Sequence, residues 1–165
     1  MKKIFSVATL ALLFLSCKKN NNPSDGYFTA TINGSSFLAG GHQSFVVYTS
    51  AQLADTSHFL LLSGGDDNQN INITLYDSNG ITNKIYYLNN PPTVAYSSSA
   101  EYRNYGKDIS HGYVTDAYHT GVINIQLDTL KHRISGSFSF KGIFQSSTDS
   151  INVTNGKFSL PYINQ

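Results

Sequence analysis

Two polar stretches of the chain carry residues that could bind a metal ion. In one of them, His111 and His119 flank Asp116, with Asp108 just ahead. A zinc site needs three or four such ligands converging at about 2.0–2.3 Å. Both histidines stand in a Gly-containing polar stretch, where solvated loop side chains are the expected alternative. The cluster is therefore a weak zinc candidate, and we expect no metal there.

The second stretch places oxygen-bearing side chains at alternate positions, Asp66, Asn68 and Asn70. This spacing is similar to the start of a calcium-binding loop. Such a loop has Gly at its sixth position and a bidentate Glu at its twelfth, where this chain has Ile71 and Asp77. Asp and Asn are also ordinary turn residues, so we expect a turn and no cofactor.

No catalytic signature is present in the sequence. The nucleophile elbow, the HExxH helix, the phosphate-binding loop and the dinucleotide fingerprint are all missing. Glycoside hydrolysis would need a pair of carboxylates with one acid in an apolar pocket. The single Glu, Glu101, and the scattered Asp residues favour no such pair. We expect a non-enzymatic protein, with an unrecognised hydrolase as the alternative.

Tyrosines gather in residues 93–120, together with Gly, Ser and Asn. A tyrosine offers a flat apolar face and a hydroxyl, which suits stacking on sugars or contact with a protein partner. The alternative is packing across neighbouring strands, since Tyr is a good strand former. This stretch loses the strict alternation of the C-terminal strands, as recognition loops often do. It is predicted to present the binding surface, with the candidates Tyr102, Tyr105, Tyr113 and Tyr118.

The elements that must position these residues are predicted to be β-strands. Residues 27–39 predict a hairpin, because Asn33-Gly34 supplies a type I′ turn that sets Ala30 opposite Phe37. Residues 151–160 predict a second hairpin about Asn155-Gly156. Further strands are expected at 43–49, 58–62, 70–76, 81–88, 93–97, 100–104, 111–115, 122–128 and 132–140, with residues 53–57 as a loop.

The alternating pattern also predicts the core. Ile123, Ile125 and Leu127 share one face of their strand, as do Phe138 and Phe140 beside outward serines. About ten short strands with frequent turns indicate an all-β fold. We expect a single antiparallel β-sandwich or β-barrel, and the sequence does not separate these two.

The first residues predict export and anchoring. Lys2 and Lys3 precede an apolar run, residues 4–15, that is too short to cross a membrane core needing roughly 20 residues. Ser16-Cys17 at its end resembles the lipobox of bacterial lipoproteins. That resemblance implies cleavage before Cys17 and acylation of this residue, the only cysteine. An ordinary cleaved signal peptide is the alternative.

The predicted organisation is a signal peptide (residues 1–16), a lipidated Cys and polar tether (17–26), and one β domain (27–165). Two of the eleven Lys and Arg lie in the signal, which leaves nine bases against ten acids in the mature chain. Such a near-neutral chain without a basic stripe argues against binding of nucleic acid.

Four motifs mark a family resemblance: TATINGSSFLA (29–39), GVINIQLDTL (121–130), ISGSFSF (134–140) and VTNGKFSLPY (153–162). The chain resembles small uncharacterised lipoproteins of Bacteroidota, a domain-of-unknown-function family. The resemblance implies a shared fold and transfers no site residue. In that phylum an acidic run after the lipidated Cys is associated with export to the cell surface. Here Lys18-Lys19 and three asparagines follow Cys17, so an outer-membrane lipoprotein could face either the periplasm or the exterior.

These observations predict a membrane-anchored envelope domain that binds a glycan or an envelope protein. A structural or assembly subunit without a small ligand is the alternative. An apolar-walled pocket with convergent polar groups would favour ligand binding, or the hydrolase, whereas a flat exposed apolar patch would favour assembly.

Overall fold

The computed structural model describes residues 26–39, 48–53, 58–94, 96–106, 112–144 and 147–164. Within these residues the fold consists of eleven strands and no helix, which confirms the all-β class. No element there is a helix with the length and apolar character needed to span a membrane. The signal and the tether up to residue 25, Cys17 included, lie outside the described residues. The strands are β1 (Tyr27–Ile32), β2 (Ser35–Leu38), β3 (Tyr48–Leu53), β4 (Phe59–Gly65), β5 (Gln69–Tyr76), β6 (Ile85–Leu88), β7 (Ser99–Asn104), β8 (Gly112–Val114), β9 (Gly121–Asp128), β10 (Arg133–Phe144) and β11 (Ser150–Asn164).

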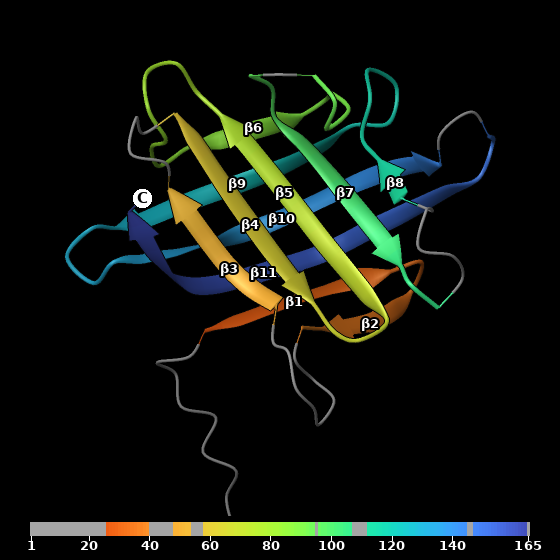
Figure 1. Cartoon of the computed structure of the whole chain (residues 1–165), viewed down its shortest axis with the longest axis horizontal. Helices are drawn as coiled ribbons and strands as arrows, with labels where there is room; N and C mark the ends of the chain where they lie inside the picture. The colour runs from red at the N-terminus through yellow and green to blue at the C-terminus, as the bar shows by residue number, and fades with distance from the viewer. Residues whose placement is uncertain are drawn as a thin grey trace, which may run out of the picture.

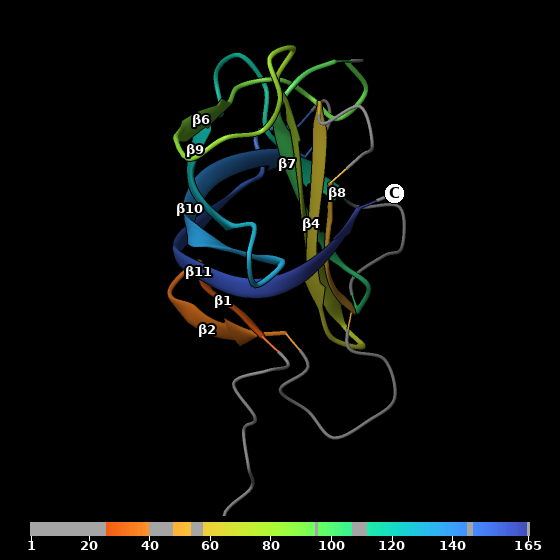
Figure 2. The same cartoon turned by 90° about the vertical axis from the view of Figure 1, so that its left-hand side faces the viewer.

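All strands belong to one strongly curled sheet (Figures 1 and 2). Pairing runs from β11 through β3, β4, β5, β7, β8 and β10 and back to β11. The β1–β2 hairpin extends the sheet from β11, and β9 with β6 extends it from β10. Figure 1 shows β4, β5 and β7 crossing in front of β9, β10 and β11, so the curled sheet also has the two layers of a sandwich.

The first hairpin forms as predicted. Asn33 and Gly34 have φ values of 47° and 86°, the positive values that a type I′ turn requires. Ala30 pairs with Phe37, and both are buried. The apolar face of this hairpin therefore points into the core.

The predicted core of the C-terminal strands is also confirmed. Ile123 and Ile125 on β9 are buried, as are Phe138 and Phe140 on β10, and Leu127 packs against them partly buried. The ring of Phe138 lies 5.1 Å from that of Phe28 and 6.3 Å from that of Phe158, measured between centroids. These three rings join β1, β10 and β11 in one aromatic cluster.

The predicted second hairpin at 151–160 is wrong, because β11 continues unbroken through Asn155-Gly156. A type I′ turn needs positive φ at two residues, and here only Asn155 has one, 53°. The pairing register of β11 with both β1 and β10 shifts by one residue at this point. The asparagine therefore forms a β-bulge in a long strand.

Several other boundaries differ from the prediction. Residues 92–94 form turns after Pro91, with the Val94 N–H bonded to the Pro91 carbonyl, so the described residues of the stretch 93–97 form no strand. The strand predicted at 81–88 begins only at Ile85, and β3 covers 48–53 where 43–49 was expected, with residues 43–47 outside the described part. One pairing is parallel, β3 with the end of β11, in a sheet otherwise antiparallel.

Candidate functional site

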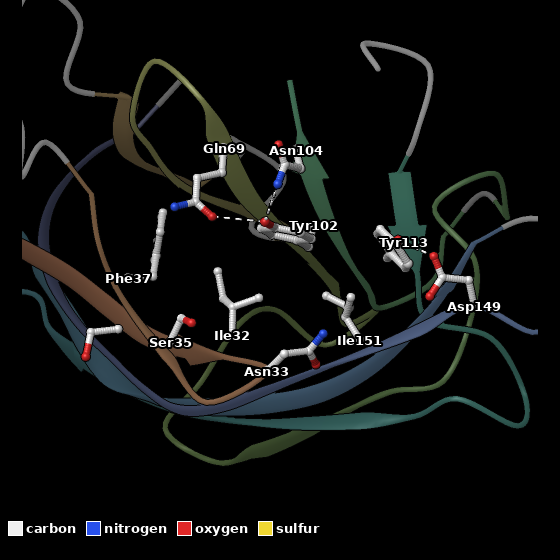
Figure 3. A pocket seen from close by; sticks show the side chains of 11 residues that line it. Ile32, Asn33, Ser35, Phe37, Gln69, Tyr102, Asn104, Tyr113, Asp149 and Ile151 are labelled. Atoms are coloured by element: carbon white, nitrogen blue, oxygen red, sulfur yellow. Dashed lines mark hydrogen bonds between the residues drawn. The ribbon is translucent and has the colours of Figure 1, made fainter. Parts of the chain in front are cut away.

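A cavity of about 370 Å³ opens between the tip of the β1–β2 hairpin and the paired strands β5, β7 and β8 (Figure 3). Its size is within the range of small-ligand pockets. The walls come from segments far apart in sequence, which the curled sheet brings together. The residues that line it are Ile32, Asn33, Ser35, Ser36, Phe37, Gln69, Tyr102, Asn104, Tyr113, Asp149 and Ile151.

Two of the predicted tyrosines form one wall of this pocket. Tyr102 on β7 and Tyr113 on β8 are directly paired, so their side chains are neighbours on one face of the sheet. Their ring centroids lie 6.1 Å apart, at an interplanar angle of 40°. Both lie on strands that the sequence predicted, 100–104 and 111–115, and Tyr102 is buried and Tyr113 half-buried. Their packing across neighbouring strands is the alternative that the sequence left open, and the exposed loops expected of a binding surface do not hold these two residues. The strand pairing holds their rings in fixed positions.

The hydroxyl of Tyr102 is held by amide side chains. It donates a hydrogen bond to Oε1 of Gln69 (2.9 Å) and accepts one from Nδ2 of Asn104 (3.4 Å), as Figure 3 shows. Burial raises the pKa of Tyr102, so the phenol stays protonated. These contacts fix the tyrosine and orient the glutamine at the pocket.

The hydroxyl of Tyr113 donates to Oδ2 of Asp149 at 2.5 Å. This hydrogen bond, with a smaller contribution from burial, raises the pKa of Tyr113 to about 12. The phenol is therefore neutral at physiological pH. Asp149 stands just before β11, in a turn closed by the Phe144 N–H on the Asp149 carbonyl and by the Asp149 N–H on Oγ of Ser147.

The opposite wall comes from the hairpin and the start of β11. Phe37, Ile32 and Ile151 supply apolar surface, all three largely buried. Asn33 stands at the hairpin tip, where its Oδ1 accepts a hydrogen bond from the backbone N–H of Asn152 (2.8 Å). The hairpin tip is thereby tied to β11, which keeps this wall in place.

The other two predicted tyrosines lie outside this pocket. Tyr105, in the turn after β7, lines a shallower depression with Asp66, Asp67, Asn70 and Asn72. Tyr118 stands in the turn after β8 and is 91% exposed. The structure therefore brings together Tyr102 and Tyr113 and separates the remaining two.

The calcium-like stretch folds as a turn. Oδ1 of Asp66 accepts the backbone N–H groups of Asn68 and Gln69, which is the bonding of an Asx turn. Asn70 is buried on β5, and its Nδ2 donates to Oγ of Ser63. Asp66 is thus engaged in holding the turn between β4 and β5.

The histidine cluster is only partly described. Nδ1 of His119 lies 2.9 Å from Oδ1 of Asp116, which also accepts the backbone N–H of Tyr118. His111 and Asp108 lie outside the described residues. In the part of the chain that the structure describes, no three His, Cys, Asp or Glu side chains converge as a metal site.

Sequence reasoning missed Gln69, Asn104, Asp149 and the hairpin tip as site residues. Asp149 is an isolated acid in a polar turn, and Asn33 reads only as a turn residue. The alternation of the predicted strand 100–104 could have placed Asn104 beside Tyr102, because residues two apart on a strand share a face. Only the pairing of distant strands brings Gln69, Asp149 and the hairpin tip beside the two tyrosines.

Fold and pocket together define a single curled all-β domain with a polar and aromatic recess beside its first hairpin. The chain belongs to the family of a domain of unknown function (DUF6252), whose model matches residues 24–160. The expected membership of an uncharacterised domain family is thereby confirmed. No curated protein and no solved structure matches the chain.

Proposed function

We propose that this protein is a lipid-anchored, non-enzymatic domain of the cell envelope that binds carbohydrate in the pocket beside the first hairpin. The observation that carries the proposal is the pairing of Tyr102 and Tyr113 on a wall shared with amide and carboxylate side chains. A pyranose ring has apolar C–H faces and a polar rim of hydroxyls. Aromatic faces and convergent polar groups complement these two parts respectively.

The position of the pocket suits a tethered receptor. The predicted tether precedes β1 and joins it at Tyr27, whereas the pocket uses Ile32 and Asn33 at the opposite end of this strand. A strand of this length separates the two points by roughly 17–20 Å. The ligand therefore approaches at a distance from the point of attachment.

The small number of acids among the described lining residues supports binding without cleavage. Glycoside hydrolysis generally uses two carboxyl groups about 5–9.5 Å apart across the scissile bond. Among the described lining residues only Asp149 is an acid, and its Oδ2 already accepts from Tyr113. A single engaged carboxylate suits recognition of a sugar hydroxyl.

The first prediction tests carbohydrate binding. On a glycan array, the detergent-solubilised full chain is expected to bind a defined set of oligosaccharides. Tyr113→Ala removes one aromatic face and the partner of Asp149, so affinity for the best ligand should fall at least about tenfold, which corresponds to roughly 1.4 kcal/mol. Tyr118→Ala is the matched control, because this exposed tyrosine lies outside the pocket and its removal should leave affinity unchanged. Circular dichroism establishes that both variants fold. Equal losses in the two variants would contradict the assignment of the pocket.

The second prediction tests the anchor. Cys17→Ala should move the protein from the membrane fraction to the soluble fraction, because several acyl chains on one residue supply the proposed attachment. Immunoblotting of fractionated cells measures the distribution, and the mobility of the band reports whether the signal has been removed. A processed Cys17→Ala protein that stays with the membrane would refute lipidation at this residue.

A further inference from the structure

The described lining of the pocket carries negative charge and no positive charge. Of the eleven lining residues that the structure describes, Asp149 is the only one with a charged side chain, and none is Lys, Arg or His. An anionic ligand would therefore meet a negative carboxylate, with no cation among these described lining residues to compensate it. At a separation of about 4 Å, two like charges near a protein surface repel strongly enough to change affinity by a factor of ten or more.

The hydrogen-bonding groups at the pocket also favour a ligand that both donates and accepts. The contacts within the described residues occupy Oε1 of Gln69 and Oδ1 of Asn33, which leaves the two amide NH₂ groups to donate. The carboxylate of Asp149 can only accept, and it keeps capacity beyond the hydroxyl of Tyr113. A sugar hydroxyl satisfies both kinds of group. A ligand carboxylate or phosphate accepts only, and would offer no donor to the remaining acceptor capacity of Asp149.

We propose that the pocket takes the uncharged end of a glycan, a hydroxylated pyranose, and rejects sugars that carry a carboxylate or phosphate. This inference rests on the proposed carbohydrate binding and names Asp149 as the residue that sets the specificity. The amides and the partly exposed ring of Tyr113 provide affinity, and the carboxylate of Asp149 provides the discrimination.

The test compares an uncharged oligosaccharide bound on the array with its counterpart in which the terminal hydroxymethyl group is oxidised to a carboxylate. Isothermal titration of the detergent-solubilised full chain gives both dissociation constants. The oxidised sugar is expected to bind at least tenfold more weakly. Asp149→Asn keeps an acceptor for the hydroxyl of Tyr113 but removes the charge, so the ratio should fall below about threefold.

Asp67→Asn is the matched control, because this exposed carboxylate lies in the turn between β4 and β5, outside the pocket. It should leave the ratio unchanged. Equal or tighter binding of the oxidised sugar by the native chain would overturn the inference while carbohydrate binding stands. If Asp149→Asn leaves the ratio of the two dissociation constants unaltered, Asp149 does not set the specificity. An array without any bound glycan would instead refute the proposed function itself.

Discussion

Phe138→Ala is expected to lower the free energy of unfolding by about 3–5 kcal/mol, the usual cost of deleting a fully packed aromatic ring. The ring of Phe138 is almost fully buried between Phe28 and Phe158. It also covers Gly156, where an added Cβ would lie 2.6 Å from the ring atoms. Because β1, β10 and β11 all contribute to this cluster, neighbouring strands are poorly placed to fill the cavity.

Denaturant titration followed by circular dichroism measures this loss. Ser137→Ala is the matched control, since Ser137 is the exposed neighbour of Phe138 on the same strand. It should change stability by less than about 0.5 kcal/mol. A loss below about 1 kcal/mol for Phe138→Ala would place its ring outside the core and contradict the packing described here.

The parts of the fold that could be predicted are those in which pattern and pairing are local. In β1–β2 the turn residues and the alternation specify the same register, so Ala30 and Phe37 are paired as expected. In β9 and β10, alternation alone identifies the buried face, because each strand has one side in the core. Neither feature depends on a distant segment.

The dipeptide Asn155-Gly156 shows that a local pattern does not always determine the backbone conformation. Both a type I′ turn and a bulge use an asparagine with positive φ, so the dipeptide is compatible with either. The apolar residues around Asn155 would also share a face in either arrangement. The choice depends on β1 and β10, which pair along both edges of β11 on either side of the bulge. Such partners are separated from Asn155 in sequence and are not visible in the local pattern.

The site was predictable only in part, for the same reason. The tyrosines of residues 93–120 indicate a surface with aromatic rings and hydroxyl groups, and two of the four candidates do line the pocket. The predicted strand 100–104 contains the buried Tyr102, whereas the exposed Tyr118 lies outside every predicted strand, so the expected elements already separate these two candidates. Gln69 and Asp149 lie at the pocket because the sheet curls and brings their segments together. The residue pattern along the chain contains no information on this curl.

Deletion of Asn155 is expected to leave the domain folded, with β11 as a regular strand. On β11, Ile151 and Val153 face the core, then Thr154 and Asn155 are both exposed, and inward alternation resumes at Gly156. Asn155 is therefore the extra residue of the bulge, and its removal restores the side-chain period of two along the strand. The buried residues Phe158, Leu160 and Tyr162 would still point inward, and β11 would pair with β1 and with β10 in one continuous register each.

Substitution of Asn155 keeps the bulge and tests its backbone. Asn155→Val should lose about 1–2 kcal/mol of stability, because a β-branched residue would occupy left-handed backbone. Asn155→Gly is the control, since glycine adopts positive φ readily and keeps the residue count, so its thermal transition should stay close to that of the native chain. Thermal melting followed by circular dichroism compares these two variants and the deletion with the native chain. A deletion variant that fails to fold would show that β11 requires the extra residue to pair with β1 and β10.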